Sequence, residues 1–122
     1  MKGLWKYIPP FAPDQSGACS VLYGYGGLTV ICDAGGCAGN VCGFDEPRWF
    51  TGKSAMFSAG LRDMDAIFGR DKQLVAKLKD AIDTVSDGMD IPFAAIVGTP
   101  VPAVIATDYA ALKRMAEKET NL

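Results

Sequence analysis

The stretch that decides the fold is Leu28-Thr-Val-Ile-Cys32, which lies between Gly24-Tyr-Gly-Gly27 and Asp33-Ala-Gly-Gly36. It is an apolar, mostly β-branched run without polar alternation, which is typical of a strand buried on both faces of a parallel sheet. The next residues, 34–41, are predicted to turn into a helix. Cys32 is therefore expected at the C-terminal end of the strand, and Cys37 near a helix N-terminus, where a thiolate is stabilised.

Further elements follow in an order that indicates an α/β fold. A short helix is predicted over 18–23, after cap-type residues at 14–17 and with Cys19 in its first turn. A weak strand signal lies at 54–58 and a stronger one at 92–98. The clearest helix is predicted at 71–86. The inward side of the helix at 71–86 is predicted to carry Leu74, Leu78, Ile82 and Val85. A last helix is predicted after a cap at Thr107 or Asp108, and its inward residues are predicted to be Tyr109, Leu112 and Met115.

This order predicts a three-layer, Rossmann-like α/β domain with a short, mostly parallel sheet and helices on both faces. At 122 residues the chain is expected to form a single domain, 1–122, with residues 1–13 as an extended arm. A further strand would be expected after the last helix. We therefore expect this domain to be the N-terminal piece of a longer subunit.

Charge and hydropathy narrow the classes of partner. The net charge is −2 and the 12 Lys and Arg residues are spread along the chain, so we expect no nucleic-acid partner. The longest apolar run, around 94–106, is interrupted by Gly98, Pro100 and Pro102, so we expect no membrane span. The N-terminus lacks the continuous apolar stretch of a signal peptide, which predicts a cytoplasmic, reduced protein.

The four cysteines carry the candidate chemistry, because the chain contains no histidine. That absence excludes imidazole relays and imidazole metal ligands. Cys32, Cys37 and Cys42 are evenly spaced in a glycine-rich stretch, and Cys19 lies upstream. Thiolates at this density favour an iron–sulfur cluster or a zinc ion, although the spacing matches neither usual pattern. Buried thiols that only fill the core are the alternative.

Several segments together resemble the nitrogenase component 1 family, which includes dark-operative protochlorophyllide reductase. Cys32-Asp-Ala-Gly-Gly-Cys37, with Cys19 upstream, is similar to the family's helix cysteine followed by His-Gly-Pro-x-Gly-Cys. Glu46-Pro-Arg-Trp49 resembles the protochlorophyllide branch. The segments 61–74 and 99–108 resemble the family's Glu-x-Asp-x-Val-Phe-Gly-Gly and Thr-Cys-x-x-x-Ile-Gly-Asp-Asp stretches.

The resemblance implies an oxidoreductase subunit domain that holds an iron–sulfur cluster for electron transfer to a reduction site. Cys19 and Cys37 carry over as cluster ligands, whereas the third family cysteine falls on Pro100. We hypothesise that Cys32 substitutes for it, because Cys42 would point about 140° away from Cys37 on a helix.

The implied partners are a homologous subunit or a second copy, which shares the cluster, and an ATP-dependent iron–sulfur reductase protein. On this interpretation the domain alone is inactive. Two alternatives stay open: a non-catalytic scaffold or assembly domain of the same fold, and a structural zinc module held by cysteines.

Overall fold

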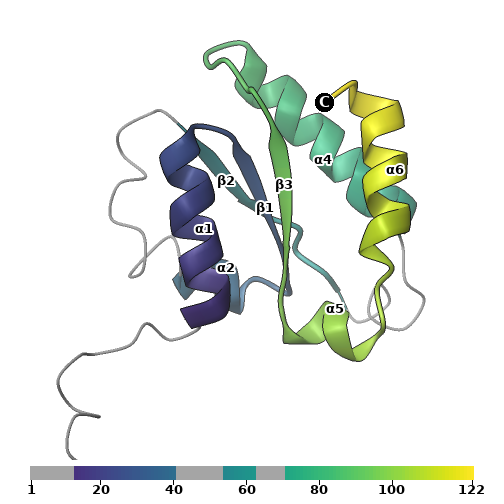
Figure 1. Ribbon diagram of the computed structural model, residues 1–122. Coiled ribbons are helices and arrows are strands. Elements are labelled where there is room, and N and C mark those ends of the chain that lie inside the picture. The colour runs from purple at the N-terminus through teal and green to yellow at the C-terminus, as the bar shows by residue number, and fades with distance from the viewer. Residues whose placement is uncertain (1–12, 41–53, 63–70) are drawn as a thin grey trace, which may run out of the picture.

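The computed structural model describes residues 13–40, 54–62 and 71–122, and it shows a small α/β fold built on a three-stranded sheet (Figure 1). The elements in chain order are α1 (Pro13–Tyr25), β1 (Leu28–Cys32), α2 (Gly36–Asn40), β2 (Ala55–Ser58), α4 (Asp71–Ser86), β3 (Ala94–Gly98), α5 (Pro100–Val104) and α6 (Tyr109–Thr120).

The sheet has the strand order β2-β1-β3, and both pairs are parallel. Leu28 pairs with Ala55 on one side and with Ala94 on the other. All five residues of β1 are buried because this strand has a neighbour along each edge, which explains its continuous apolar sequence. The chain enters β1 through Gly27, where a Cβ atom would come within 2.5 Å of the Phe93 ring.

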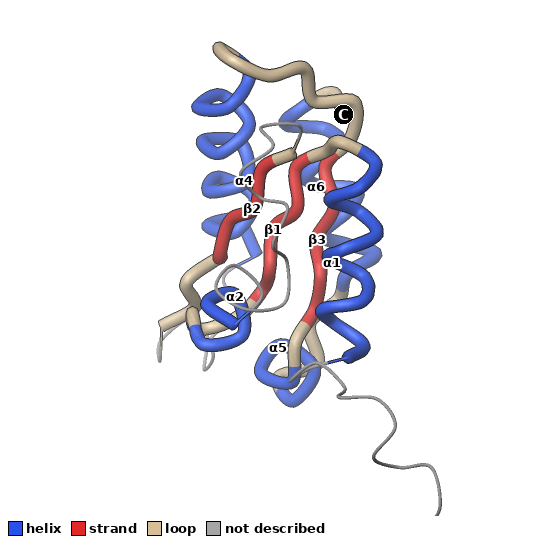
Figure 2. Tube along the Cα trace, turned by 90° about the vertical axis from the view of Figure 1, so that its left-hand side faces the viewer, coloured by secondary structure: helices blue, strands red, loops and turns tan. Residues whose placement is uncertain are grey.

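Two apolar clusters lie on opposite sides of β1, because successive side chains of a strand alternate between the faces of the sheet. On one side, Leu28, Val30 and Cys32 pack with α4 and α6. The buried residues that the two helices contribute to this cluster are Leu74, Val75, Leu78, Ala81, Leu112 and Ala116. Ile31 packs with Cys19 of α1 and Ala38 of α2. Figure 2 shows β1 in the middle of the sheet, with α1 on the side nearer the viewer.

Most of the predicted elements are confirmed. The strand at 28–32 and the helix at 71–86 have the predicted bounds, and β2 and β3 fall within the predicted strands at 54–58 and 92–98. Asp108 is the N-cap of α6, since its carboxylate accepts a hydrogen bond from Ala111 N–H at 2.9 Å. The inward face of α4 differs slightly from the prediction: Val75 and Ala81 are buried, while Ile82 and Val85 are half-buried.

Two predictions require correction. α1 begins at Pro13, which was expected in the arm, because proline is well tolerated at the first helical position. Cys19 therefore lies in the middle of this helix rather than in its first turn. In the last helix, Leu112 and Ala116 are the buried residues, and Tyr109, although 36% exposed, points inward to Cys32 as predicted.

The short helix α5 was not predicted, because its prolines were interpreted only as breaks in an apolar run. The remainder of the predicted arm, residues 1–12, lies outside the described residues. Among the helices of the described ranges, none combines the length and the apolar character needed to span a membrane.

Candidate functional site

The strand order reverses at β1, and we call the region at the C-terminal ends of β1 and β3 the strand-end region. The chain passes from the central strand β1 to β2 on one side, and then crosses to β3 on the other side. In open parallel sheets such a reversal leaves a ligand-accessible opening beyond the strand ends. Cys32 ends β1 there and pairs with Gly98, the last residue of β3. The residues that follow both strands are therefore the candidate site.

Cys32 is a buried, free thiol on the α4 and α6 side of the sheet. Its thiol forms a hydrogen bond with the side chain of Tyr109, the first residue of α6. Burial raises the pKa of the Cys32 thiol, the carboxylates of Asp33 and Asp71 raise it further, and the hydrogen bond with Tyr109 partly offsets this increase. Cys32 is consequently a neutral thiol at neutral pH, which makes it a poor nucleophile in the absence of a metal.

Tyr109 and Thr99 complete the surroundings of Cys32. The pKa of Tyr109 is raised to about 12, first by burial and then by the neighbouring Cys32. The hydroxyl of Thr99, itself buried, donates a hydrogen bond of 2.7 Å to the backbone carbonyl of Cys32. This bond joins the end of β1 to the start of α5, so the two chain segments of the strand-end region are tied together.

Asp33 organises the other side of the strand-end region, toward β2 and α2. Its side chain is 1% exposed, and its two carboxylate oxygens accept hydrogen bonds from the Ser58 hydroxyl at 2.7 Å and from Ala38 N–H at 2.9 Å. In addition, Leu61 N–H donates to the Asp33 carbonyl at 2.7 Å. Asp33 therefore links the end of β1 to the end of β2 and to α2. Gly35, with φ of 117°, makes the turn between Asp33 and α2 possible.

The predicted ligands fall into two groups. Cys19 is fully buried in α1 and belongs to the cluster that contains Ile31 and Ala38, on the face opposite the cluster of Cys32. Cys37 lies in α2, directly before Ala38, and its side chain lies outside the described residues, as does Cys42. The fold thus brings α2 against Cys19, and it places the Cys32 thiol on the other side of β1.

Within the described parts of the chain, no group of three or more Cys, Asp or Glu residues is placed to hold a metal ion. The ligand roles of Cys19, Cys37 and Cys32 therefore stay predictions. The chemistry of the donors can still be compared between the two faces. Cys19 belongs to a buried cluster with Ile31 and Ala38, whereas Cys32 lies on the opposite face, where its thiol is hydrogen-bonded to Tyr109.

Asp33, Thr99 and Tyr109 were not singled out as site residues by the sequence. An acidic residue directly after a buried strand is the signal that could have identified Asp33, because such a carboxylate must find donors near the strand end. Thr99 follows β3 in the same way. Tyr109 gave no such signal, because its contact with Cys32 joins residues that are far apart in the chain.

Comparisons of the chain with protein families, with curated proteins and with solved structures found no match.

Proposed function

We propose that this chain is an oxidoreductase domain of the nitrogenase component 1 type, which binds an iron–sulfur cluster through Cys19 and Cys37. The observation that carries the proposal is the group of buried side chains in which Cys19 of α1 and Ala38 of α2 pack with Ile31 of β1. Since Cys37 is the neighbour of Ala38 in a five-residue helix, its backbone lies next to the region of Cys19. The helix that carries Cys37 thus lies on the same side of β1 as Cys19.

Asp33 supports the position of Cys37 in this proposal. Its carboxylate fixes Ala38 N–H and the Ser58 hydroxyl, so α2 has one defined position relative to the strand ends. A ligand on a helix held in this way loses little conformational entropy when it binds. The surroundings of Cys19 are apolar and buried, which suits a centre that has to be protected from water.

A bound iron–sulfur cluster would supply one-electron transfer. Such clusters usually have four protein ligands, and this proposal assigns two of them to the present chain. We propose that a homologous subunit or a second copy supplies the rest, and that an ATP-dependent iron–sulfur reductase protein delivers the electrons. The chain itself would hold and orient the cluster and would perform no substrate chemistry alone.

The proposal includes a three-layer, Rossmann-like architecture and a cytoplasmic location. The apolar clusters on the two sides of β1 support the layered arrangement. A reducing compartment is proposed because the cluster thiols must remain unoxidised. The charge of the chain argues against a nucleic-acid partner, as the sequence predicts.

The position of Cys32 distinguishes this function from the alternatives. A zinc site made of all four thiolates would need Cys32 and Cys19 around one ion, whereas they pack into clusters on opposite faces of the sheet. The position of Cys32, on the face opposite Cys19, favours a supporting role for this residue over ligation of the same cluster. A scaffold domain without a cluster is the remaining alternative, and it predicts that no iron is retained.

Anaerobic reconstitution with ferrous iron and sulfide tests the proposal. We expect the wild-type chain, supplied with a thiol to complete the ligand set, to retain iron and to show broad visible absorption. Cys19→Ser and Cys37→Ser are expected to abolish both signals, whereas Cys32→Ser, a matched control with the same atom exchange, is expected to retain them. Loss of iron in Cys32→Ser alone would return Cys32 to the ligand set, and a colourless wild-type protein would exclude the cluster.

A further inference from the structure

We propose that the groove between α4 and α6 binds an acidic amphipathic helix of a partner protein. This α4–α6 groove has a volume of about 530 Å³, and it is lined by Lys72, Val75, Ala76, Lys79, Met115, Lys118 and Glu119. None of these residues is a proposed ligand of the iron–sulfur cluster. The inference is therefore independent of the proposed function.

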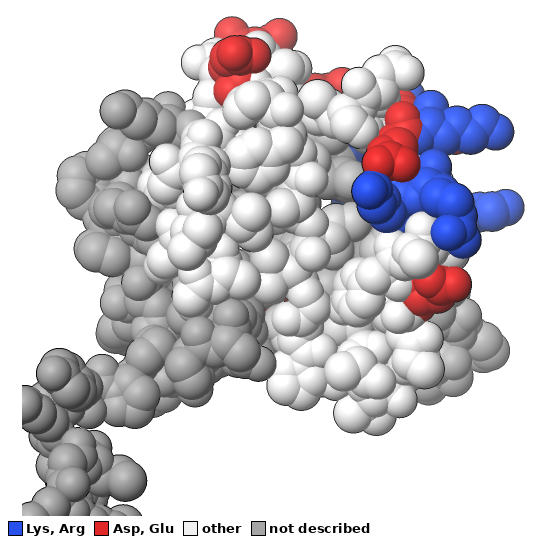
Figure 3. Space-filling model, in the orientation of Figure 1, with Lys and Arg blue, Asp and Glu red and all other residues white. Residues whose placement is uncertain are grey.

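The charge of the α4–α6 groove is opposite in sign to that of the whole chain. The net charge of the chain is −2, whereas the groove is lined by three lysines and one glutamate. Figure 3 shows Lys and Arg side chains gathered at the right, on the side of α6, with acidic side chains beside them and at the top. A partner with negative charge therefore complements this groove.

The lysines of the groove are available to such a partner. Three of them have no ion-pair partner among the residues that the structure describes: Lys72, Lys79 and Lys118. The other two lysines of these helices are already engaged. Lys113 pairs with Glu117 at 3.5 Å, and Lys77 Nζ donates a hydrogen bond of 2.6 Å to the carbonyl of Ala59.

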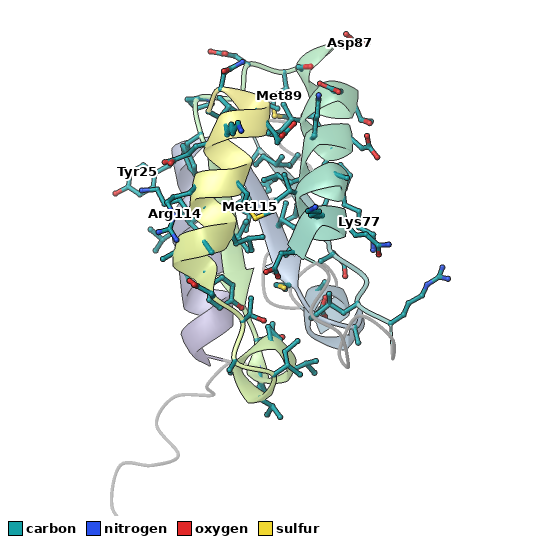
Figure 4. The ribbon with its side chains drawn as sticks, turned by 90° about the vertical axis from the view of Figure 1, so that its right-hand side faces the viewer. Tyr25, Lys77, Asp87, Met89, Arg114 and Met115 are labelled. Atoms are coloured by element: carbon teal, nitrogen blue, oxygen red, sulfur yellow. The ribbon has the colours of Figure 1, made fainter. Side chains whose placement is uncertain are left out.

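The floor of the groove is apolar. Val75 of α4 is buried, Met115 of α6 is half-buried, and both pack in the apolar cluster beneath the two helices. Figure 4 shows Met115 on the side of α6 that faces α4. A methionine side chain is unbranched and adapts to the shape of an apolar partner. Ala76 is exposed and small, so a further helix can approach α4 closely at this point.

The charged and apolar positions have the spacing that a helix can match. Lys72, Ala76 and Lys79 follow one another at steps of four and three, so they form one stripe on α4. Along the helix axis the two lysines are about 10 Å apart. A partner helix lying along this stripe can place carboxylates seven positions apart beside the lysines, and apolar side chains between them over Ala76 and Met115.

Glu119 distinguishes this partner from a uniformly anionic one. It lies in the wall of the groove next to Lys118, and no ion pair neutralises it within the described ranges. A nucleic acid or an anionic membrane surface would bring negative charge against this carboxylate, which is unfavourable. A helix can place a neutral or basic residue there and keep its carboxylates opposite the lysines. The groove therefore favours a protein partner.

Binding of a synthetic peptide to the full chain tests this docking site. The probe is a fluorescent helix of about 15 residues, with two glutamates seven positions apart and leucines three and four positions after the first glutamate. We expect this peptide to bind, to shift the methyl resonance of Met115, and to bind more weakly as the salt concentration is raised. The same peptide with lysines in place of its glutamates is expected not to bind.

Charge reversals inside and outside the groove locate the bound peptide. Lys79→Glu on α4 and Lys118→Glu on α6 are each expected to raise the Kd at least about tenfold. Arg114→Glu is the matched control, because Figure 4 shows Arg114 on the side of α6 away from α4, and its Kd is expected to change less than about twofold. A peptide with one glutamate changed to lysine should bind Lys79→Glu more tightly than it binds the wild type.

Several outcomes would overturn the proposal. If the acidic peptide did not bind, or if the acidic and basic peptides bound equally, the groove would not select an acidic helix. Equal Kd values for Lys79→Glu, Lys118→Glu and Arg114→Glu would place the peptide elsewhere on the surface. Short duplex DNA or vesicles of anionic lipid that bound more tightly than the acidic peptide, and lost this binding in Lys79→Glu, would assign the groove to a polyanion instead.

Discussion

Replacement of Asp33 by alanine is the most direct test of how the C-terminal ends of the strands are held together. The carboxylate is buried and accepts one hydrogen bond from Ala38 N–H at 2.9 Å and one from the Ser58 hydroxyl at 2.7 Å. A hydrogen bond to a charged group contributes about 1.5–3 kcal/mol to stability. Ser58 is exposed, and its hydroxyl can bond to water when the carboxylate is removed, so we take the lower end of this range for the bond between Ser58 and Asp33. The expected cost of Asp33→Ala is therefore about 3–4 kcal/mol.

Urea unfolding of matched variants measures this cost. Asp33→Ala is expected to lower the midpoint strongly, because about 3 kcal/mol is a large part of the 5–15 kcal/mol that stabilises a domain. Ser58→Ala removes only one partner and is expected to cost about 1–2 kcal/mol. Asp83→Ala, on the exposed side of α4, controls for the loss of a carboxylate and is expected to change stability by less than about 0.5 kcal/mol. If Asp33→Ala and Asp83→Ala unfolded at the same urea concentration, Asp33 would not organise the strand ends.

Two further predictions concern the surroundings of Cys32. Thr99→Val removes the hydroxyl that donates to the carbonyl of Cys32, and we expect it to lower the free energy of unfolding, measured in urea, by about 1–2 kcal/mol. Thr99→Ser keeps the donor, and its free energy of unfolding should fall by less than half of that amount. The pKa of Tyr109 is raised to about 12, so the folded protein holds the phenolic proton more tightly than the unfolded chain does. The contribution of this group to stability is therefore present below about pH 10 and is lost as the pH rises toward 12. An ultraviolet difference titration of wild type against Tyr109→Phe should show late phenolate formation, and Cys32→Ala should shift it to lower pH; an unshifted titration would mean that the two side chains do not interact.

Much of the fold could be predicted because its signals are local. The apolar run at 28–32 predicts a strand and the periodic pattern at 71–86 predicts a helix, each from consecutive residues alone, and both elements have the predicted bounds. α5 was missed because Pro100 and Pro102 interrupt an apolar segment, although a proline is well suited to the first turn of a helix. Local patterns leave such short elements ambiguous.

The site was only partly predictable, because its geometry depends on which face of the sheet each cysteine occupies. Cys32 and Ile31 are neighbours in the chain, yet they face opposite clusters because side chains alternate along a strand. The sequence identified Cys19, Cys32 and Cys37 as candidates without separating them. The pairing of Cys32 with Tyr109 likewise joins two distant residues.

The sequence by itself determined the α/β character of this protein, the fully buried strand at 28–32 and the absence of histidine chemistry, since these follow from residue types and their periodicity. Only the tertiary structure decided that Cys19 lies with α2 while Cys32 lies with α6, and that Asp33 ties three elements together. The physical reason is that strand order and the packing of helices on each face are set by contacts between segments far apart in the chain, and no local pattern encodes them.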